Sequence, residues 1–350
     1  MKKELLFKML TTPSVSGYEL AFQKMLINEM KDVDDLVLKH HSLNVVHVVN
    51  PNSSVKVMLL AHIDEIGLMI ERVLDNGICK LTNVGAVRPE MYIGQHVNVV
   101  KYDEKGNYTY IPGVIGYTPN YVDGHVKVED LNLDLGTSSK EESLKLVSVG
   151  DAVTHKDCYQ ELANDALASR ALDDKISAFI GCEVLRKVKE RSTNGVYLVT
   201  TVGEETTGRG AVFSTVDVTP TLAVALDVGS SSDVAYRNNF TREVSLGKGG
   251  MLTHNSASNK LLVKRLEKVA NEKNIPVQYV VEVSKTYTDF DQVFKNNGGI
   301  PSTLISVPLR YMHSSVEVCS LKDAEYITDL LVEFICSLTE NDTFNPFLEE

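Results

Sequence analysis

The sequence predicts an α/β fold in which a small all-β unit interrupts an open sheet flanked by helices. Apolar, strand-like segments alternate with segments of helical periodicity in the first and last parts of the chain. From 67 to 160, short alternating runs and frequent glycines replace that pattern. In addition, four apolar segments lead directly into a histidine or a carboxylate, as expected where sheet strands end beside a site.

Capping and turn signals mark the first elements. Ser16-Gly17-Tyr18-Glu19 has the Ser-x-x-Glu form of a capping box and predicts a helix that extends to about Met30. Strands are predicted at 44–49 and 55–60, because the turn signal Asn50-Pro51-Asn52 separates two apolar runs.

The segment 67–160 is interpreted as an inserted β domain, and 1–66 together with 161–350 as one catalytic domain. Strand-like runs occur within the insert at 95–100, 110–117 and 125–129. The candidate site residues lie on both sides of the insert: His62 and Asp173 are 173 − 62 = 111 residues apart. A parallel crossover needs only about a dozen residues, so most of this gap is extra structure.

The α/β pattern resumes after the insert and continues to the end of the last helix. That helix is predicted from the capping box Ser320-Leu321-Lys322-Asp323 to about Leu338. The other predicted elements are helices at 175–189 and 259–272 and strands at 196–202, 222–226 and 303–307.

Composition excludes several classes of function. The formal net charge of −12 argues against nucleic acid or an anionic membrane as the main partner. No apolar run approaches the ~20 residues of a transmembrane helix, and the first residues lack the pattern of a signal peptide. The five cysteines are scattered and never spaced as Cys-x-x-Cys. We therefore expect unpaired thiols and a cytoplasmic location.

Five residues at strand ends or a helix start form a candidate ligand set for two metal ions: His62, Asp173, Glu205, Asp227 and His313. Two imidazoles and three carboxylates suit zinc, with cobalt or manganese as alternatives. Two divalent ions carry +4, which three carboxylates and a bridging hydroxide would neutralise. A single ion would leave surplus negative charge in a desolvated site.

Two further carboxylates are candidate catalytic residues. Asp64 lies two residues after His62, where it could accept the other N–H of that imidazole and fix its tautomer. Glu204 precedes Glu205, and successive strand side chains point to opposite sides. We therefore expect the two carboxylates to differ in role, one binding metal and the other transferring protons as general base and acid.

In this order, the motifs around these residues resemble those of the glutamyl aminopeptidase and tetrahedral aminopeptidase family of dinuclear metallopeptidases. The resemblance covers essentially the whole chain. The matching segments are Ser16-Gly17-Tyr18-Glu19, Ala61-His62-Ile63-Asp64-Glu65-Ile66-Gly67, Ala171-Leu172-Asp173-Asp174-Lys175, Gly203-Glu204-Glu205, Gly208-Arg209-Gly210-Ala211, Ala225-Leu226-Asp227 and Pro308-Leu309-Arg310-Tyr311-Met312-His313-Ser314.

The resemblance implies a role for each matching residue. Asp173 would bridge the two metals through its carboxylate, with a cis peptide bond to Asp174. His62 and Asp227 would complete one metal site, and Glu205 and His313 the other. Glu204 would be the catalytic base, and Asp64 the partner of His62.

The resemblance also implies an α/β/α sandwich of the zinc-peptidase type, whose inserted β domain mediates contacts between subunits. Family members commonly assemble from dimers into a dodecamer.

Three segments of the sequence depart from the family pattern. Thr206-Thr207 replaces Val-Gly, Tyr287 and Phe290 flank Thr288-Asp289 where Gly and Ala are usual, and Ser177 replaces a Gly. Because none of these is a proposed ligand, they bear on side-chain preference and leave the reaction class unchanged.

The sequence thus favours an aminopeptidase that acts on peptides with a free N-terminus. A related two-metal carboxypeptidase, dipeptidase or deacylase is an alternative, because the ligand types do not reveal which substrate end is held. A cellulase is a weaker alternative, since glycosidase chemistry uses two carboxylates and would leave both histidines without a role. A metal-binding scaffold would not need Glu204.

Overall fold

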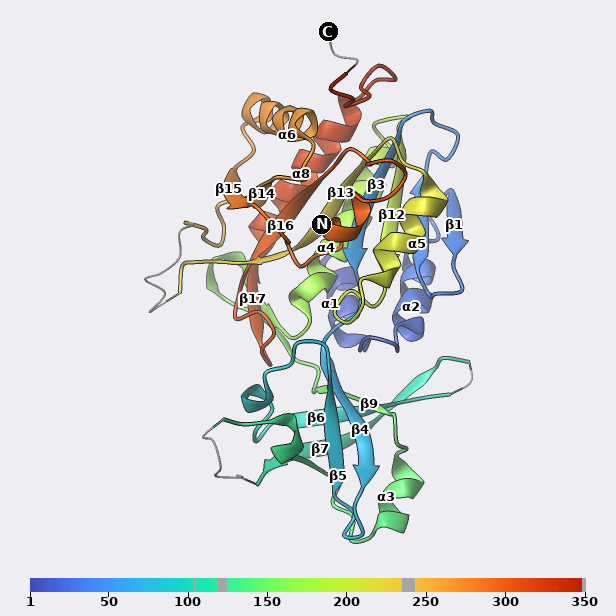
Figure 1. Ribbon diagram of the computed structural model, residues 1–350, viewed down its shortest axis with the longest axis vertical. Helices are drawn as coiled ribbons and strands as arrows, with labels where there is room; N and C mark the ends of the chain where they lie inside the picture. Colours follow the sequence, from blue (N-terminus) through green and yellow to red (C-terminus); the bar gives the residue numbers. More distant parts are fainter. Residues whose placement is uncertain (104, 119–124, 235–242, 348–350) are drawn as a thin grey trace.

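In the computed structural model, the α/β parts of the chain and the insert form two bodies, drawn one above the other in Figure 1. The structure describes residues 1–350 except 104, 119–124, 235–242 and 348–350. The upper body contains an 11-stranded sheet, and the lower body a closed β-barrel.

The large sheet has the strand order β1-β2-β12-β3-β13-β16-β17-β11-β10, with β14 paired to β16 and β15 paired to β14. Its centre is parallel, since β3 pairs in parallel with β12 and β13, and β13 with β16. The strands are β1 (Leu36–Lys39), β2 (Val45–Val49), β3 (Lys56–His62), β10 (Tyr159–Glu161), β11 (Ala166–Ser169), β12 (Gly195–Thr201), β13 (Leu222–Ser230), β14 (Gly250–Asn255), β15 (Val277–Glu282), β16 (Ser302–Arg310) and β17 (Glu317–Ser320).

Strand β3 shows why the sheet needs helices on both faces. Its residues Val57, Leu59 and Ala61 belong to one hydrophobic core, whereas Met58 and Leu60 belong to another. Successive strand side chains point to opposite faces, so an apolar strand must be covered twice. The first core includes α1 (Lys3–Thr11), α2 (Leu20–Met30), α4 (Leu172–Lys189), α6 (Lys260–Lys273) and α8 (Leu321–Cys336), and the second α5 (Arg209–Val218) and α7 (Phe290–Val293). The predicted α/β/α sandwich is confirmed.

The lower body is a barrel closed in the order β4-β5-β8-β7-β6-β9 around a core of its own. Its elements are β4 (Gly67–Val73), β5 (Cys79–Val84), β6 (His96–Tyr102), β7 (Tyr108–Tyr117), β8 (Leu131–Asp134), α3 (Lys140–Leu146) and β9 (Ala152–His155). The expectation of a strand at 125–129 is wrong, because Val128–Asp130 forms a 3₁₀ turn in which Asp130 accepts a hydrogen bond from the backbone of Lys127.

The two predicted capping boxes have different outcomes. Ser320 caps α8, accepting a hydrogen bond from the backbone N–H of Lys322. Ser16 does not cap α2, which begins at Leu20, because its hydroxyl donates to the carboxylate of Asp64 at 2.7 Å. A buried charged acceptor outcompetes the local backbone for this hydroxyl.

Two bulk expectations can be compared with the structure. Among the described residues, no helix is both long enough and apolar enough to cross a membrane. All five cysteines are unpaired, and Cys79, Cys182 and Cys319 are buried, as expected for structural thiols.

A buried ion network joins the barrel to the sheet. The carboxylate of Glu65, next to the start of β4, accepts hydrogen bonds from Lys175 Nζ at 3.0 Å and from the backbone of Ser14 at 2.9 Å. Arg170 contacts Glu65 through its guanidinium and also pairs with Asp157 at 2.6 Å. Burial alone would raise the pKa of Glu65, but Arg170 and Lys175 hold it at about 2.

Glu65→Gln should destabilise the protein by about 3–5 kcal/mol at pH 7, because it leaves Arg170 and Lys175 buried without their common partner. The folded pKa of about 2 lies below the usual 4.5. The contribution of Glu65 is therefore complete above about pH 4.5 and is lost as pH falls towards 2. Denaturant unfolding of wild type and variant across this range measures the difference.

The matched control is Glu71→Gln, at an exposed position in β4. It should change the free energy of unfolding by less than about 0.5 kcal/mol. A pH-independent difference for Glu65→Gln, or one as small as the control's, would contradict the proposed role of the network.

Candidate metal centre

Four parallel strands and one helix bring the predicted ligands to the same edge of the sheet. β3 ends at His62, which lies opposite Thr201 at the end of β12. β13 carries Asp227, and β16 ends three residues before His313. α4 packs against β3 and β13 with Asp173 in its first turn. The carboxyl ends of the parallel strands therefore form this site.

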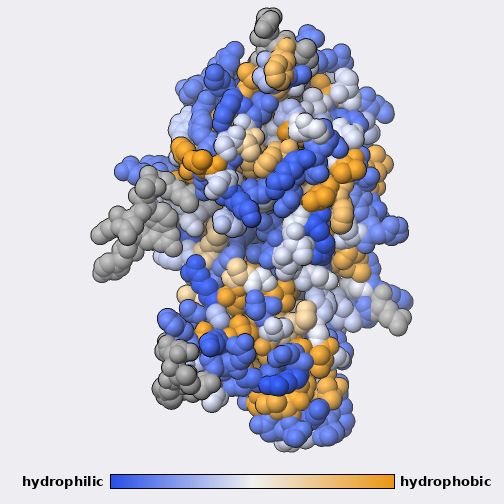
Figure 2. Space-filling view, viewed as in Figure 1, coloured by the Kyte–Doolittle hydropathy of each residue, from blue (hydrophilic) through white to orange (hydrophobic). Residues whose placement is uncertain are grey.

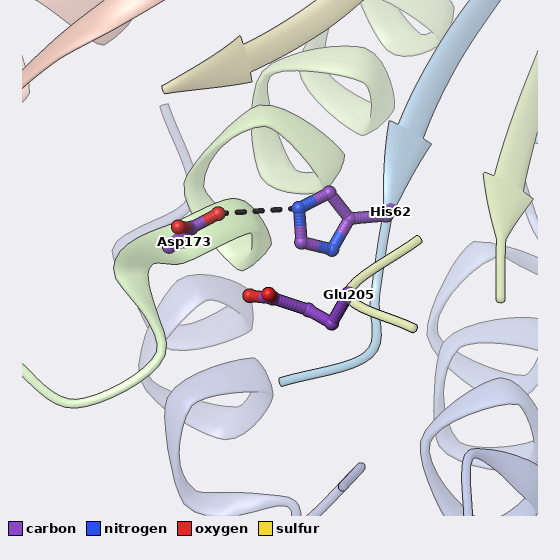
Figure 3. Close-up of side chains that lie close together, drawn as sticks. All are labelled: His62, Asp173 and Glu205. Carbon is purple, nitrogen blue, oxygen red and sulfur yellow. Dashed lines mark hydrogen bonds and ion pairs between the residues drawn. The ribbon is translucent and has the colours of Figure 1, made fainter. Parts of the chain in front are cut away.

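Asp173 lies between two imidazoles. Its Oδ1 is 3.1 Å from His62 Nε2, and its Oδ2 is 3.2 Å from His313 Nε2. His313 Nε2 is also 3.5 Å from Glu205 Oε1. Figure 3 shows His62, Asp173 and Glu205 pointing toward one another from three different segments. The bond between Asp173 and Asp174 is a cis peptide, as the family resemblance implied.

These spacings fit metal ligation. Two ligand atoms that each lie about 2.1 Å from a tetrahedral ion are about 3.4 Å apart. His62 Nδ1 lies 3.0 Å from the backbone carbonyl oxygen of Asp64, and that oxygen can only accept. The proton that donates to this oxygen is therefore on Nδ1, which leaves Nε2 facing the carboxylate of Asp173. Burial alone would lower the pKa of His62, but Asp173 and the neighbouring carboxylates raise it well above its usual value. A cation bound at this point would take the place of the Nε2 proton between the imidazole and the carboxylate.

A second group of possible ligands includes a residue that the sequence did not single out. The ligand atoms of His62, Asp174 and Asp227 lie within 4.8 Å of one another, as do those of His62, Asp173 and Glu205. Asp174 is completely buried, and neither of its carboxylate oxygens has a hydrogen-bond partner among the described residues. Burial and the neighbouring Asp227 raise the pKa of Asp174. Buried carboxylates in such numbers favour cations as partners.

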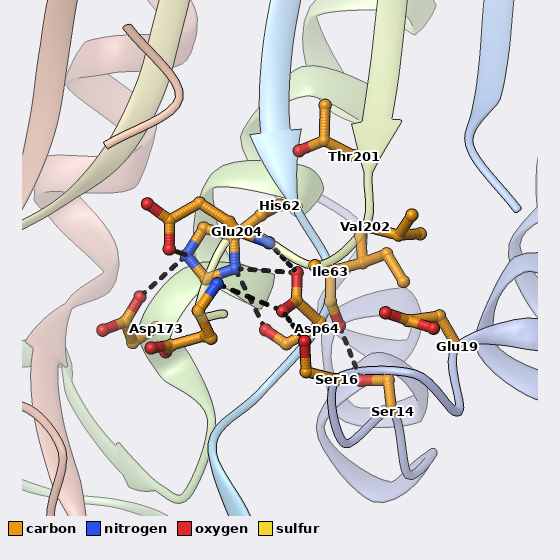
Figure 4. Close-up of polar contacts among 12 residues, drawn as sticks. Ser14, Ser16, Glu19, His62, Ile63, Asp64, Asp173, Thr201, Val202 and Glu204 are labelled. Atoms are coloured by element: carbon orange, nitrogen blue, oxygen red, sulfur yellow. Dashed lines mark hydrogen bonds and ion pairs between the residues drawn. The ribbon is translucent and has the colours of Figure 1, made fainter. Parts of the chain in front are cut away.

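Asp64 accepts a hydrogen bond from His62, but through its backbone oxygen and not through the expected carboxylate. The backbone carbonyl of Asp64 accepts from His62, while the carboxylate is 3.7 Å away. The carboxylate instead accepts from the backbone N–H groups of Glu204 and Glu205, at 3.0 and 3.3 Å, and from Ser16 (Figure 4). Asp64 thus orients the imidazole with its main chain and the Glu204-Glu205 turn with its side chain.

Glu204 and Glu205 do not belong to a strand, so the argument from alternating side chains does not apply. β12 ends at Thr201, and the chain then turns, with Thr207 and Gly208 donating to the carbonyl of Gly203. Both carboxylates reach the site but approach different imidazoles. Glu204 Oε2 lies 3.9 Å from His62 Nε2, whereas Glu205 Oε1 is near His313. Burial raises the pKa of Glu204 to about 10, and nearby carboxylates add to this effect. The positive charge of bound ions would lower this pKa and leave the carboxylate able to accept a proton.

Two more buried carboxylates support the site. Glu317 is 2% exposed and accepts the backbone N–H groups of Asp173, at 3.1 Å, and His313, at 2.9 Å. Asp289 is equally buried and accepts the hydroxyl of Thr201. Neither follows a strand-end pattern. The only sequence signal for Glu317 was an acidic residue four positions after His313.

Six of the seven predicted site residues line a cavity of about 480 Å³, whereas Asp64 and the additional carboxylates Asp174, Asp289 and Glu317 are not part of its lining. Its inner wall includes His62, Asp173, Glu204, Glu205, Asp227 and His313. Its opposite wall includes Val228, Met251 and Leu304 together with residues 282–288. The cavity can therefore hold an apolar or polar side chain next to a cluster of carboxylates and imidazoles.

We compared the sequence and structure of this chain with those of known proteins to identify its family. The sequence profile of the M42 glutamyl aminopeptidases matches residues 44–330. The chain belongs to this family. The predicted resemblance is confirmed, and with it the predicted reaction class, a metal-dependent aminopeptidase.

Relatives of this M42 chain match along nearly their whole length. A lysyl aminopeptidase of Pyrococcus furiosus is 30% identical, with 98% of this chain and 99% of the relative covered. A TET aminopeptidase from the marine sediment archaeon Thaumarchaeota archaeon SCGC AB-539-E09 has a TM-score of 0.89 at 27% identity, covering 98% of each chain. The TET1 peptidase of Pyrococcus horikoshii has a TM-score of 0.80 at 28% identity, covering 96% of this chain and 99% of its own.

Glu317→Gln should lower metal affinity by about tenfold or more, because the amide cannot accept both backbone N–H groups and so loosens Asp173 and His313. Titration of the metal-free variant with zinc against a competing chromophoric chelator measures the affinity. Glu325→Gln, at an exposed position on α8, is the matched control and should bind zinc like wild type. Equal affinities in all three proteins would remove Glu317 from the site's supporting residues.

Proposed function

We propose that this protein is a dinuclear aminopeptidase in which Glu204 transfers protons without binding metal. The observation that carries the proposal is the different placement of the two adjacent glutamates. Glu205 shares a compact set of ligand atoms with His62 and Asp173, and Glu204 lies beside that set without joining it.

The ligands form two groups around Asp173. His62 and Asp227 would hold one ion, with Asp174 nearby, and Glu205 and His313 would hold the other. Zinc suits this mixture of imidazole and carboxylate ligands, with cobalt or manganese as alternatives. When bound, two divalent ions lower the pKa of a shared water and polarise the scissile carbonyl.

The chain's own residues perform the proton transfers. Glu204 Oε2 takes a proton from the attacking water and then delivers it to the nitrogen of the departing amine. The Asp64 carboxylate holds the backbone of Glu204, which limits how far the base can move between these two steps. Together, the backbone and carboxylate of Asp64 keep the base and His62 in a fixed relation.

The same cluster explains the need for a free amino group. With the ions bound, a free N-terminal amine would find a Lewis acid and also hydrogen-bond acceptors in the carboxylates that line this cavity. An internal peptide bond offers no such amine, and the whole chain before it would have to enter the cavity beside the metal ligands. The substrates are therefore peptides with a free N-terminus.

Glu204→Gln should keep both metals and lower kcat by ~10² or more, since an amide cannot act as a general base. Glu205→Gln should instead lose affinity for one metal. Each variant is the other's matched control, because the two isosteric changes lie at adjacent positions. Metal analysis and kcat are measured on both proteins. Equal metal loss with retained activity in Glu204→Gln would reverse the assigned roles.

Acetylation of the substrate N-terminus should lower kcat/KM by about 10³ or more, because the acetyl group removes the free amine and adds bulk beside the metal ligands. The test uses leucyl, lysyl and glutamyl peptides, each free and acetylated, with zinc or cobalt added back after chelation. Acetylated peptides cut as fast as free ones, or cut internally, would favour a deacylase or an endopeptidase.

We further propose that the barrel of this protein carries contacts between subunits of a homo-oligomer, with a dodecamer built from dimers as the expected form. The relative from Pyrococcus horikoshii can assemble into a tetrahedron or a large octahedral shell. Figure 2 shows apolar surface over the barrel. In the insert, Leu144, Leu146 and Val149 are exposed. Light scattering should therefore give a mass well above 38.7 kDa.

The five unpaired cysteines support a cytoplasmic location.

A further inference from the structure

Beside the cavity that holds the metal ligands lies a second cavity, of about 390 Å³. The two share Glu204, Glu205 and His313 at their inner end and Lys285, Tyr287 and Thr288 along their common ridge. Only the first cavity contains His62, Asp173 and Asp227. A substrate whose scissile bond lies over Glu204 therefore has space on both sides.

The two cavities differ in their surroundings. The first has apolar walls of low exposure, from Val228, Met251 and Leu304. The second cavity lacks these apolar residues and is bordered by exposed residues of its own, among them Thr206, Thr207 and Lys295. An exopeptidase needs a limited space for the first residue and an open path for the rest of the peptide. The first cavity thus suits the N-terminal residue, and the second the departing part.

The second cavity also contains both signs of charge. Glu204 and Glu205 line it together with the first cavity, and Lys285 and Lys295 line it as well. Among the described residues, neither lysine has a carboxylate partner within 4.0 Å. Asp291 also lines this cavity, but its carboxylate accepts the backbone N–H groups of Thr286 and Tyr287. Lys285 is shared with the first cavity, whereas Lys295, which lies over the ring of Phe294, lines the second cavity alone.

We propose that Lys285 and Lys295 form a subsite for a carboxylate on the departing side of the substrate. The subsite rests on the proposed function, because it needs the N-terminal amine at the inner carboxylates. A short peptide has an amine at one end and a carboxylate at the other, and the two lysines carry the charge opposite to that carboxylate. The carboxylate has two sources: the C-terminus of a short peptide, or an acidic side chain after the scissile bond.

The test compares peptides that differ only in this carboxylate. With X as the N-terminal residue that is cut fastest, the substrates are X-Ala, X-Ala amide and X-Glu amide, and then X-Ala-Ala and X-Ala-Ala-Ala as acids and amides. X-Ala should have a KM about two- to fivefold lower than its amide, the size expected for exposed charge pairs. The preference should weaken in 0.5 M salt and as the peptide lengthens.

Three variants assign the effect. Lys285→Gln and Lys295→Gln should each reduce the ratio of amide to acid KM, and the double variant should bring it to about one. Lys264→Gln, an exposed lysine on α6, is the matched control and should keep the wild-type ratio. Thermal unfolding of each variant reports whether the fold is intact.

The outcomes separate the subsite from the proposed function. A preference for X-Ala over its amide assigns the subsite to the C-terminal carboxylate, and a preference for X-Glu amide over X-Ala amide assigns it to an acidic side chain. Equal KM values for all three substrates, or a preference that survives in the double variant, would overturn the subsite while leaving the aminopeptidase intact. Failure to cut any of these peptides would instead contradict the proposed function.

Discussion

The concentration of buried negative charge at one edge of the sheet governs this structure. Asp64, Asp173, Asp174, Asp227, Asp289 and Glu317 are all buried around two imidazoles. Buried like charges are unfavourable unless cations or hydrogen-bond donors share the cost of their desolvation. The local fold supplies donors wherever the main chain can reach, as at Asp64 and Glu317. Asp173 and Asp227 line the cavity, which is where metal ions would carry the compensating charge.

The same constraint explains why the chain turns where it does. The end of β12 places two backbone N–H groups against Asp64, and the loop after β16 places the N–H of His313 against Glu317. Each loop thus neutralises one carboxylate with its main chain and presents a side chain to the cavity. In this protein, the loops after β12 and β16 are held by Asp64 and Glu317, which do not themselves line the cavity.

Much of the fold, and the residues that gather at the candidate site, could be predicted from the sequence because the signals are local. An apolar run that ends in His62 or Asp227 marks both a strand and its functional end within a few residues. The details that failed depend on tertiary contacts. Ser16 has the form of a helix cap but donates to Asp64, which is distant in sequence. The roles of Asp174 and Glu317 depend on how α4 packs against the strands of the sheet. The chain turns before Glu204, so the alternating side-chain directions of a strand do not apply to Glu204 and Glu205.

The position of the barrel has a consequence for how this protein is held together. The insert leaves the sheet after His62 and returns before Asp173, so in the proposed dinuclear site one ion ties together the two ends of a long excursion. Closing a loop of this length removes about 4–5 kcal/mol of chain entropy from the unfolded state. The pairing of Glu65 with Arg170 closes nearly the same loop without metal. Two interactions therefore close the loop that contains the insert: the proposed metal site and the ion pair of Glu65 with Arg170. Loss of metal would weaken the contacts of the reaction centre, while the ion pair would keep the barrel attached to the sheet.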